Sequence, residues 1–271
     1  MMKYVIVLLS ICLAVLYSCQ TETKEKVEEV KAVTEDETFD ANTKYKLPSP
    51  VELYLLIREA NAQFNAQALN PTKNVSNYLT NSQKAINFGI YASDLAYCTV
   101  FERQQETTTY FKTLKDLATQ LGITEGYNNS IVERLDRNLH NSVSLYQITH
   151  DSYWEVCNAL EEGDKSGILS QILLGGWVES VYLAVHSVKK FDANDEIVIR
   201  ITEQSFLLEN LIAYLSTINK SKEVDGHIAK LKDLQNSFDK LLDNPENIVI
   251  TKEQFVEIAD KIKALRAELI K

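Results

Sequence analysis

The sequence predicts an all-α protein, a multi-helix bundle of about seven to nine helices. Between Pro71 and Pro245 the 271-residue chain contains no proline, and the whole chain contains only eight glycines. Strand-rich folds of this size need many turns, and turns favour glycine and proline. Apolar residues also recur at helical spacing, most clearly near the C-terminus. That stripe steps by three and four residues through Phe255, Ile258, Ile262, Leu265 and Leu269.

The chain begins with a short apolar run. Lys3 supplies one positive charge, and residues 4–17, YVIVLLSICLAVLY, are almost without polar side chains. A membrane-spanning helix needs roughly 20 apolar residues, so this shorter run is typical of a secretory signal. Ser18 and Cys19 follow and resemble the lipobox of bacterial lipoproteins, in which the cysteine is lipidated and becomes the new N-terminus. We therefore predict a signal peptide at 1–18 and lipidation of Cys19; the alternative is an uncleaved signal anchor with an incidental cysteine.

The resemblance to lipoproteins implies that the protein is bound to a membrane, and it indicates where in the cell that membrane lies. Three acyl chains on Cys19 would hold the protein at a membrane far more firmly than the marginal anchoring that one chain provides. Gln20 stands where many lipoproteins retained at the inner membrane have Asp, which favours the outer membrane. Related proteins displayed at the cell surface carry an acidic cluster after the cysteine, whereas here QTETK contains one acid. We expect a lipid-anchored envelope protein that faces the periplasm, with surface display as the alternative.

Residues 19–47 are expected to form the lipidated cysteine and a flexible charged tether. In residues 20–47 acids alternate with bases, and no apolar stripe is kept. Such a segment buries too little apolar surface to offset the entropy of ordering. As a random coil it would span roughly 30 Å. The alternative is a charged helix with Lys–Glu pairs. The folded domain is then expected at 48–271, which is long enough for a sizeable core.

Helix-start signals place the individual elements. Ser49 is a good N-cap, Pro50 suits the first helical position and Glu52 completes a capping box. Thr251 and Gln254 form a second capping box before the last helix. One long helix is expected at 75–104, and a second helix follows it and ends at residue 121. The remaining helices are expected at 127–139, 142–161, 166–190, 195–217 and 224–242.

Two of these helices are apolar nearly all round, at residues 85–101 and 172–188. In a soluble domain such helices are central, with neighbours on several sides. Each has a glycine followed four residues later by a serine, namely Gly89 and Ser93, and Gly176 and Ser180. Small residues at this spacing allow helices to approach closely. The offset of 87 residues raises the hypothesis of two related halves.

The few polar residues of the two central helices share faces. They are Asn87, Tyr91 and Asp94 on the first helix, and Glu179, Tyr182 and His186 on the second. A buried carboxylate is costly unless it is paired or hydrogen-bonded, so we predict that the two stripes meet in one polar seam. The seam has two interpretations: a small-ligand pocket with Trp177 or Trp154 as a wall, or an internal network that fixes helix register. We favour the internal network.

Three stretches support this grouping by resemblance. PSPVELYLLIREA, NFGIYASDLAY and GGWVESVYLA resemble uncharacterised all-helical lipoproteins of Bacteroidota-type bacteria, over roughly residues 47–190. The pattern of that family is closer to Gly-Val-Tyr-Gly-Ala-Asp, and Ala92 and Ser93 replace its small residues here. The resemblance implies no activity. It implies that four residues belong to one arrangement, namely Tyr91, Asp94, Trp177 and Glu179.

Several classes of function lack their sequence signals. The net charge of −10 argues against nucleic-acid binding. The sequence contains no Glu-x-x-His, no His-Glu-x-x-His, no glycine-rich phosphate loop and no Gly-x-Ser-x-Gly. We therefore predict no metal, no cofactor and no identifiable catalytic residue. Cys98 and Cys157 would either form a disulfide in an oxidising compartment or remain buried thiols.

The leading hypothesis is a non-enzymatic lipoprotein whose helical domain binds a small ligand or an envelope protein. The alternative is a periplasmic hydrolase that uses Asp94 and Glu179 as an acid–base pair in a central cleft. A third hypothesis is a purely structural envelope protein. An open cleft that reaches both carboxylates would favour the ligand or enzyme hypotheses, and a closed seam would favour structure.

Overall fold

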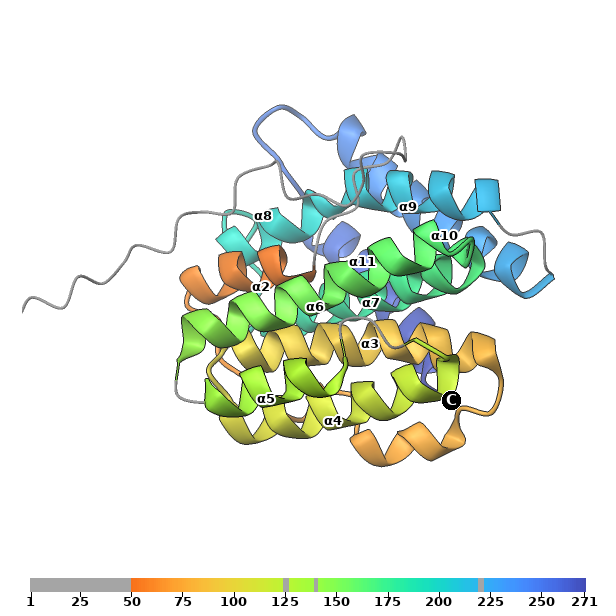
Figure 1. Ribbon diagram of the computed structural model, residues 1–271. Helices are drawn as coiled ribbons and strands as arrows, with labels where there is room; N and C mark the ends of the chain where they lie inside the picture. The colour runs from red at the N-terminus through yellow and green to blue at the C-terminus, as the bar shows by residue number, and fades with distance from the viewer. Residues whose placement is uncertain (1–49, 124–126, 139–140, 219–221) are drawn as a thin grey trace, which may run out of the picture. The chain divides into compact units, whose positions relative to one another are not determined.

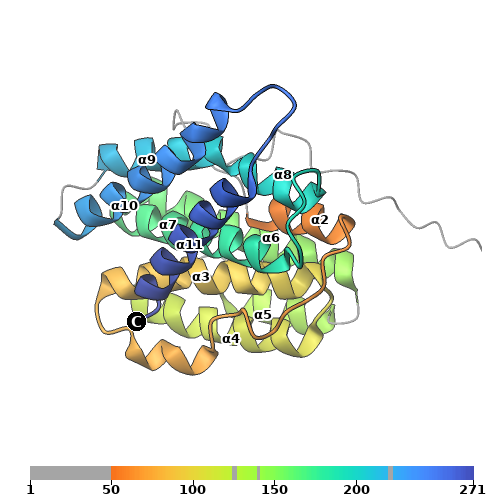
Figure 2. The ribbon, with the colours of Figure 1, turned by 180° about the vertical axis from the view of Figure 1, so that it is seen from behind.

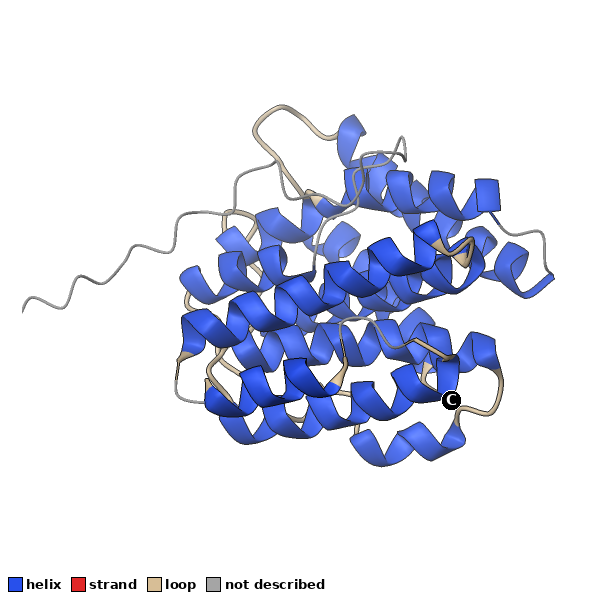
Figure 3. Cartoon of the chain, in the orientation of Figure 1, coloured by secondary structure: helices blue, strands red, loops and turns tan. Residues whose placement is uncertain are grey.

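The computed structural model describes residues 50–271, except 124–126, 139–140 and 219–221. Within these residues the secondary structure is helical and contains no strand, so the all-α prediction is confirmed (Figure 3). The predicted signal peptide, Cys19 and the tether lie outside the described residues.

The helices begin and end close to the predicted positions. In order they are α2 (Pro50–Glu59), η2 (Thr72–Asn77), α3 (Asn81–Val100), α4 (Gln104–Leu121), α5 (Asn129–Arg137), α6 (Ser142–Glu162), α7 (Ser166–Ser187), α8 (Glu196–Thr202), α9 (Gln204–Ile218), α10 (Lys222–Asp239), η3 (Lys240–Asp243) and α11 (Lys252–Leu269). The described residues thus form ten α-helices, because the helix predicted at 195–217 is interrupted at Glu203. Neither glycine nor proline stands there, so the break has no local sequence signal.

Capping boxes fix the starts of two helices, α3 and α11. At α11 the Thr251 hydroxyl accepts from the Gln254 backbone N–H, and the Gln254 side chain accepts from the Thr251 N–H, which is the predicted capping box. Thr80 and Gln83 form the same arrangement at α3. The second box explains why α3 begins at Asn81 and not at residue 75, since the cap satisfies the N–H groups that a helix start leaves unpaired.

The two apolar helices are the centre of the domain, as predicted. α3 packs along α7, and α2 and α6 each contact both of them (Figure 1). α4 covers α3, α9 and α11 cover α7, and α10 lies outside against α9 and α11 (Figure 2). α7 is long and apolar enough to cross a membrane, but 83% of its apolar window is buried inside the domain, as in the core helix of a globular protein.

Glycines allow the central helices to approach backbone to backbone. A methyl group on Gly89 would overlap the carbonyl oxygen of Ile172, and one on Gly175 would overlap that of Ile86. The contact is reciprocal: 86 positions separate Gly89 from Gly175, and 86 separate Ile86 from Ile172. In this contact Gly89 is therefore the counterpart of Gly175, whereas the sequence pattern pairs Gly89 with Gly176. The hypothesis of two related halves stays a prediction.

The two cysteines of the domain are free thiols. Cys98 on α3 and Cys157 on α6 are both buried, and no disulfide joins them. Burial raises the pKa of both thiols, which keeps them protonated and poorly nucleophilic. They therefore act as small apolar side chains of the core.

Alanine at Gly89 or at Gly175 should destabilise the domain by about 1–3 kcal/mol, because the added methyl forces α3 and α7 apart. Gly226→Ala in α10 is the matched control, since no atom lies within 4 Å of the added methyl. That variant should gain about 0.5–1 kcal/mol from helix propensity. Urea unfolding followed by circular dichroism measures both effects. Equal midpoints for Gly89→Ala and the wild type would show that the close approach is dispensable.

Candidate functional site

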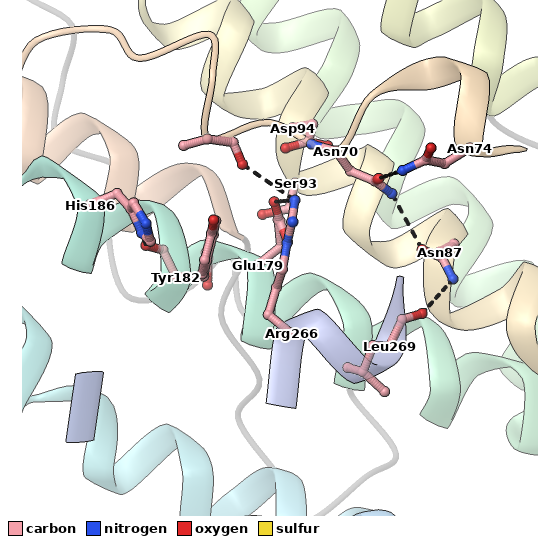
Figure 4. A network of polar contacts seen from close by, with 12 residues as sticks. Asn70, Asn74, Asn87, Ser93, Asp94, Glu179, Tyr182, His186, Arg266 and Leu269 are labelled. Atoms are coloured by element: carbon pink, nitrogen blue, oxygen red, sulfur yellow. Dashed lines mark hydrogen bonds and ion pairs between the residues drawn. The ribbon is translucent and has the colours of Figure 1, made fainter. Parts of the chain in front are cut away.

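A bidentate ion pair lies in the interior of the domain. Arg266 on α11 donates from Nε to Glu179 Oε2 at 2.9 Å and from Nη2 to Glu179 Oε1 at 3.0 Å (Figure 4). Glu179 on α7 is 0% exposed and Arg266 is 7% exposed. Burial acts to lower the pKa of Arg266, but the attraction of Glu179 outweighs it and the pKa is raised. The pair joins the last helix of the chain to a central helix.

A second carboxyl group, Asp94 on α3, belongs to the same cluster and is also 0% exposed. Burial, and then the charge of Glu179, hold the pKa of Asp94 well above its usual range, so Asp94 keeps its proton to a higher pH than an exposed aspartic acid does. Its Oδ2 accepts from the backbone N–H of Asn70 at 3.2 Å, and no donor in the described residues reaches Oδ1. Burial also raises the pKa of Glu179, while the charge and hydrogen bonds of Arg266 and the hydrogen bond from Asp94 act to lower it. With the shared proton on Asp94, the cluster of one guanidinium, one carboxylate and one carboxylic acid is neutral.

The cluster also holds the long connection between α2 and α3, residues 60–80. Arg266 Nη2 donates to the carbonyl oxygen of Ala68 at 3.3 Å, two residues before the Asn70 N–H that Asp94 accepts. The side-chain amide of Asn70 donates to the Tyr78 hydroxyl at 3.0 Å and accepts from Asn74 at 2.9 Å. Irregular backbone inside a protein needs polar partners for its N–H and C=O groups. Here the carboxyl–guanidinium cluster supplies two of them.

Tyrosine hydroxyls hold the same connection from α3 and α4. Tyr91 donates to the carbonyl oxygen of Pro71 at 3.0 Å, and Tyr110 donates to that of Asn70 at 2.9 Å. Tyr97 donates to the carbonyl oxygen of Gln63 at 3.3 Å. Although Tyr91 shares a face of α3 with Asp94, its hydroxyl bonds to the connection. Its structural role is to fix a loop and not to solvate a carboxylate.

The other seam residues of α3 and α7 lie at different distances from the carboxyl groups. Asn87 joins the network, because its amide accepts from Asn70 at 3.4 Å and donates to the Leu269 carbonyl at 2.9 Å (Figure 4). The Tyr182 ring lies under the guanidinium of Arg266, 4.5 Å from ring centroid to Cζ. His186 is half-buried against Tyr182 and bonds through Nδ1 to the Tyr182 carbonyl oxygen at 2.9 Å, and burial lowers its pKa.

Trp177 lies apart from the seam. Two residues along an α-helix correspond to about 200°, so Trp177 points away from the face of α7 that carries Glu179. Its side chain is buried, and its indole N–H has no hydrogen-bond partner among the described residues. Trp177 therefore packs in the core and forms no wall beside the carboxyl groups.

Arg266 and Asn70 are the central residues that sequence reasoning missed. Arg266 follows Ile258 and Ile262 at intervals of four, which places it on the buried face of α11. A charged residue on an apolar stripe was thus a usable signal for a buried ion pair. Asn70 lies in an irregular connection, where no periodicity marks buried positions.

The arrangement limits the chemistry that the two carboxyl groups perform. Burial opposes the ionisation of Asp94, and Glu179 is paired with Arg266, so neither is a free general base. A surface depression of about 510 Å³ lies between the connection and α4, and its lining includes Pro71 and Tyr110 but neither carboxyl group. Across the described residues, no three His, Cys, Asp or Glu side chains gather in a metal-binding group. Protein families, curated proteins and solved structures, when compared with this chain, give no match.

Arg266→Met should destabilise the domain by about 3–5 kcal/mol, because it leaves Glu179 buried without its partner. The double variant Glu179→Gln with Arg266→Met should recover part of this loss, since it removes both charges. Arg137→Met is the matched control. Its partner Glu133 lies on the exposed face of α5, and an exposed pair contributes at most about 0.5 kcal/mol. Chemical denaturation of the three variants measures their free energies of unfolding. Equal losses of stability in Arg266→Met and Arg137→Met would contradict the prediction.

Stability should fall as the pH rises above the ordinary pKa of an aspartic acid. In the unfolded chain Asp94 ionises near pH ~4, whereas in the folded state it keeps its proton to a higher pH. The folded state therefore binds one more proton, and the free energy of unfolding decreases with pH by up to about 1.4 kcal/mol per unit until the raised pKa is passed. The window begins near pH ~4 and ends at the raised pKa of Asp94. His186 and His227, whose pKa burial lowers, titrate alike in the wild type and in a variant at Asp94, so the difference between the two isolates Asp94.

The variant Asp94→Asn tests this explanation. The side-chain amide of this variant cannot ionise and donates to Glu179 at every pH. The free energy of unfolding should therefore depend less on pH than in the wild type, by the contribution of one proton. Asp94→Ala should instead lose about 1–3 kcal/mol at every pH, because Asn70 and Glu179 lose a partner. Thermal melts across the window measure both variants. A slope that is the same in Asp94→Asn and in the wild type would show that Asp94 is not the titrating group.

Proposed function

We propose that the protein is a lipid-anchored envelope protein whose helical domain serves binding or structure and not catalysis. The proposal has two parts, a membrane anchor at Cys19 and a non-catalytic domain. Each part is supported by a different observation.

The sequence around Cys19 supports the anchor. A single positive charge, a short apolar run and a small residue before a cysteine occur together in the first 19 residues. Directly after Cys19 the chain becomes polar and charged. A core helix would need a polar face toward water, and the apolar run has none. We propose that the protein lies at the outer membrane and faces the periplasm, because Gln20 and not Asp follows the cysteine.

The closed cluster supports a non-catalytic domain, and it is the observation that carries this part. Asp94 and Glu179 are both 0% exposed, and Arg266 neutralises the charge that remains. A hydrolase that used this pair would need water and substrate to reach it. A buried, neutral cluster on three helices instead fixes the positions of those helices. Ligand or partner binding is then expected at the surface of the domain.

Metabolic labelling with palmitate tests the anchor. The full chain should incorporate label, and Cys19→Ala should lose it and pass from the membrane fraction to the soluble fraction. Cys12→Ala is the matched control, because Cys12 lies in the same apolar run but lacks the preceding lipobox residues. It should be labelled like the wild type. Equal labelling of Cys19→Ala and the wild type would refute the anchor.

A further inference from the structure

Large apolar side chains are exposed mainly in one part of the domain. Seven such residues are exposed in the described part of the chain, and four of them lie between residues 242 and 256. They are Leu242 at 86%, Val256 at 45%, Val249 at 44% and Ile248 at 37%. Exposed apolar residues scattered singly need no explanation, whereas a group of them marks a surface that is covered in use.

Leu242, Ile248 and Val249 lie within residues 242–249, which comprise the end of η3 and the loop after it and which we name the apolar loop. This segment extends beyond the neighbouring helices in both views (Figures 1 and 2). Asn244 and Gln254 exchange two hydrogen bonds of 3.0 Å through their side-chain amides, which ties the base of the loop to the first turn of α11. Ile250 directly after the loop is buried. The apolar side chains are therefore displayed at a defined position.

The charge of the loop limits what it can contact. Asp243 and Glu246 are exposed, and the loop itself carries no lysine or arginine. Of the lysines that flank it, Lys240 is paired with Glu257 and Lys252 is followed by a glutamate. An anionic surface would repel the two carboxylates of the loop, so charge does not attract the loop to acidic lipid or to nucleic acid. Apolar side chains with exposed acids beside them fit a surface that is uncharged overall, with an apolar layer close below it.

We propose that the apolar loop docks on a neutral, zwitterionic lipid surface, namely the membrane that bears the anchor. This inference rests on the proposed lipidation of Cys19. The described domain begins at Pro50, and the predicted tether of residues 20–47 has a reach of roughly 30 Å. A domain on such a tether stays close to the bilayer, so a weak contact is enough to orient it.

Docking on a bilayer agrees with the shape of the surface better than docking on a second copy of the chain. A stable protein–protein interface buries about 800 Å² on each partner and is closely complementary in shape. A projecting loop with three apolar side chains offers far less area than this. Insertion of a few apolar side chains into the bilayer interface requires no complementary partner surface.

Fluorescence quenching by brominated lipid tests the inference on the full, lipidated chain in phosphatidylcholine vesicles. Val249→Trp should lose most of its added fluorescence when the acyl chains carry bromine. Leu79→Trp is the matched control: Leu79 is 79% exposed and follows η2, which both views place on the side of the helices opposite to the loop. Its added fluorescence should be unchanged. The unsubstituted protein gives the contribution of Trp154 and Trp177.

The outcomes separate the inference from the proposed anchor. If the protein is labelled at Cys19 and floats with the vesicles but Val249→Trp is not quenched, the docking is refuted and the anchor stands. Equal quenching at the two positions also refutes it, because the domain then has no fixed orientation. Replacing part of the phosphatidylcholine with phosphatidylglycerol should reduce quenching, and an increase would overturn the choice of a neutral surface. Absence of both label and flotation refutes the anchor and the docking together.

Discussion

The neutralisation of buried charge at the cluster of Asp94, Glu179 and Arg266 is the constraint on which the arrangement of the helices depends. The three residues come from α3, α7 and α11, which span most of the domain sequence. Each charged group is stable in the interior only while the others are in place, because an unpaired buried charge is strongly unfavourable. The C-terminal helix is therefore part of the core and not an addition to a finished bundle.

The same cluster explains how a long irregular connection is kept on the surface of the central helices. Residues 60–80 form a long connection for a compact domain, and η2 is the only helical part of it. Its backbone is held at Ala68 by Arg266 and at Asn70 by Asp94. Tyr91 and Tyr110 bond to neighbouring carbonyl groups. The polar stripe of α3 is thus used to satisfy backbone groups, which is why its tyrosines need no contact with the carboxyl groups.

A closed interior moves the search for function to the surface. The surface depression beside the connection and the apolar loop lie on different elements, one against α4 and the other before α11. A lipid anchor and a docked loop would orient the domain with respect to the membrane and leave the depression side open to the aqueous phase. In this arrangement the buried cluster contributes rigidity, which keeps both surfaces in a fixed relation.

The sequence by itself determined the helices and the two that are central, because caps and apolar periodicity act over a few residues. It also placed Asn87 and Asp94 on one face of α3, since helical spacing fixes which side chains are neighbours. Only the tertiary structure decided that Arg266 neutralises Glu179 and that Asn70 bonds to Asp94. Arg266 is 87 residues from Glu179 in the chain, and no local spacing encodes such a pairing. Because Glu179 is removed from water, its carboxylate needs a charged or hydrogen-bonding partner. The packing of α11 against α7 decided that this partner is Arg266.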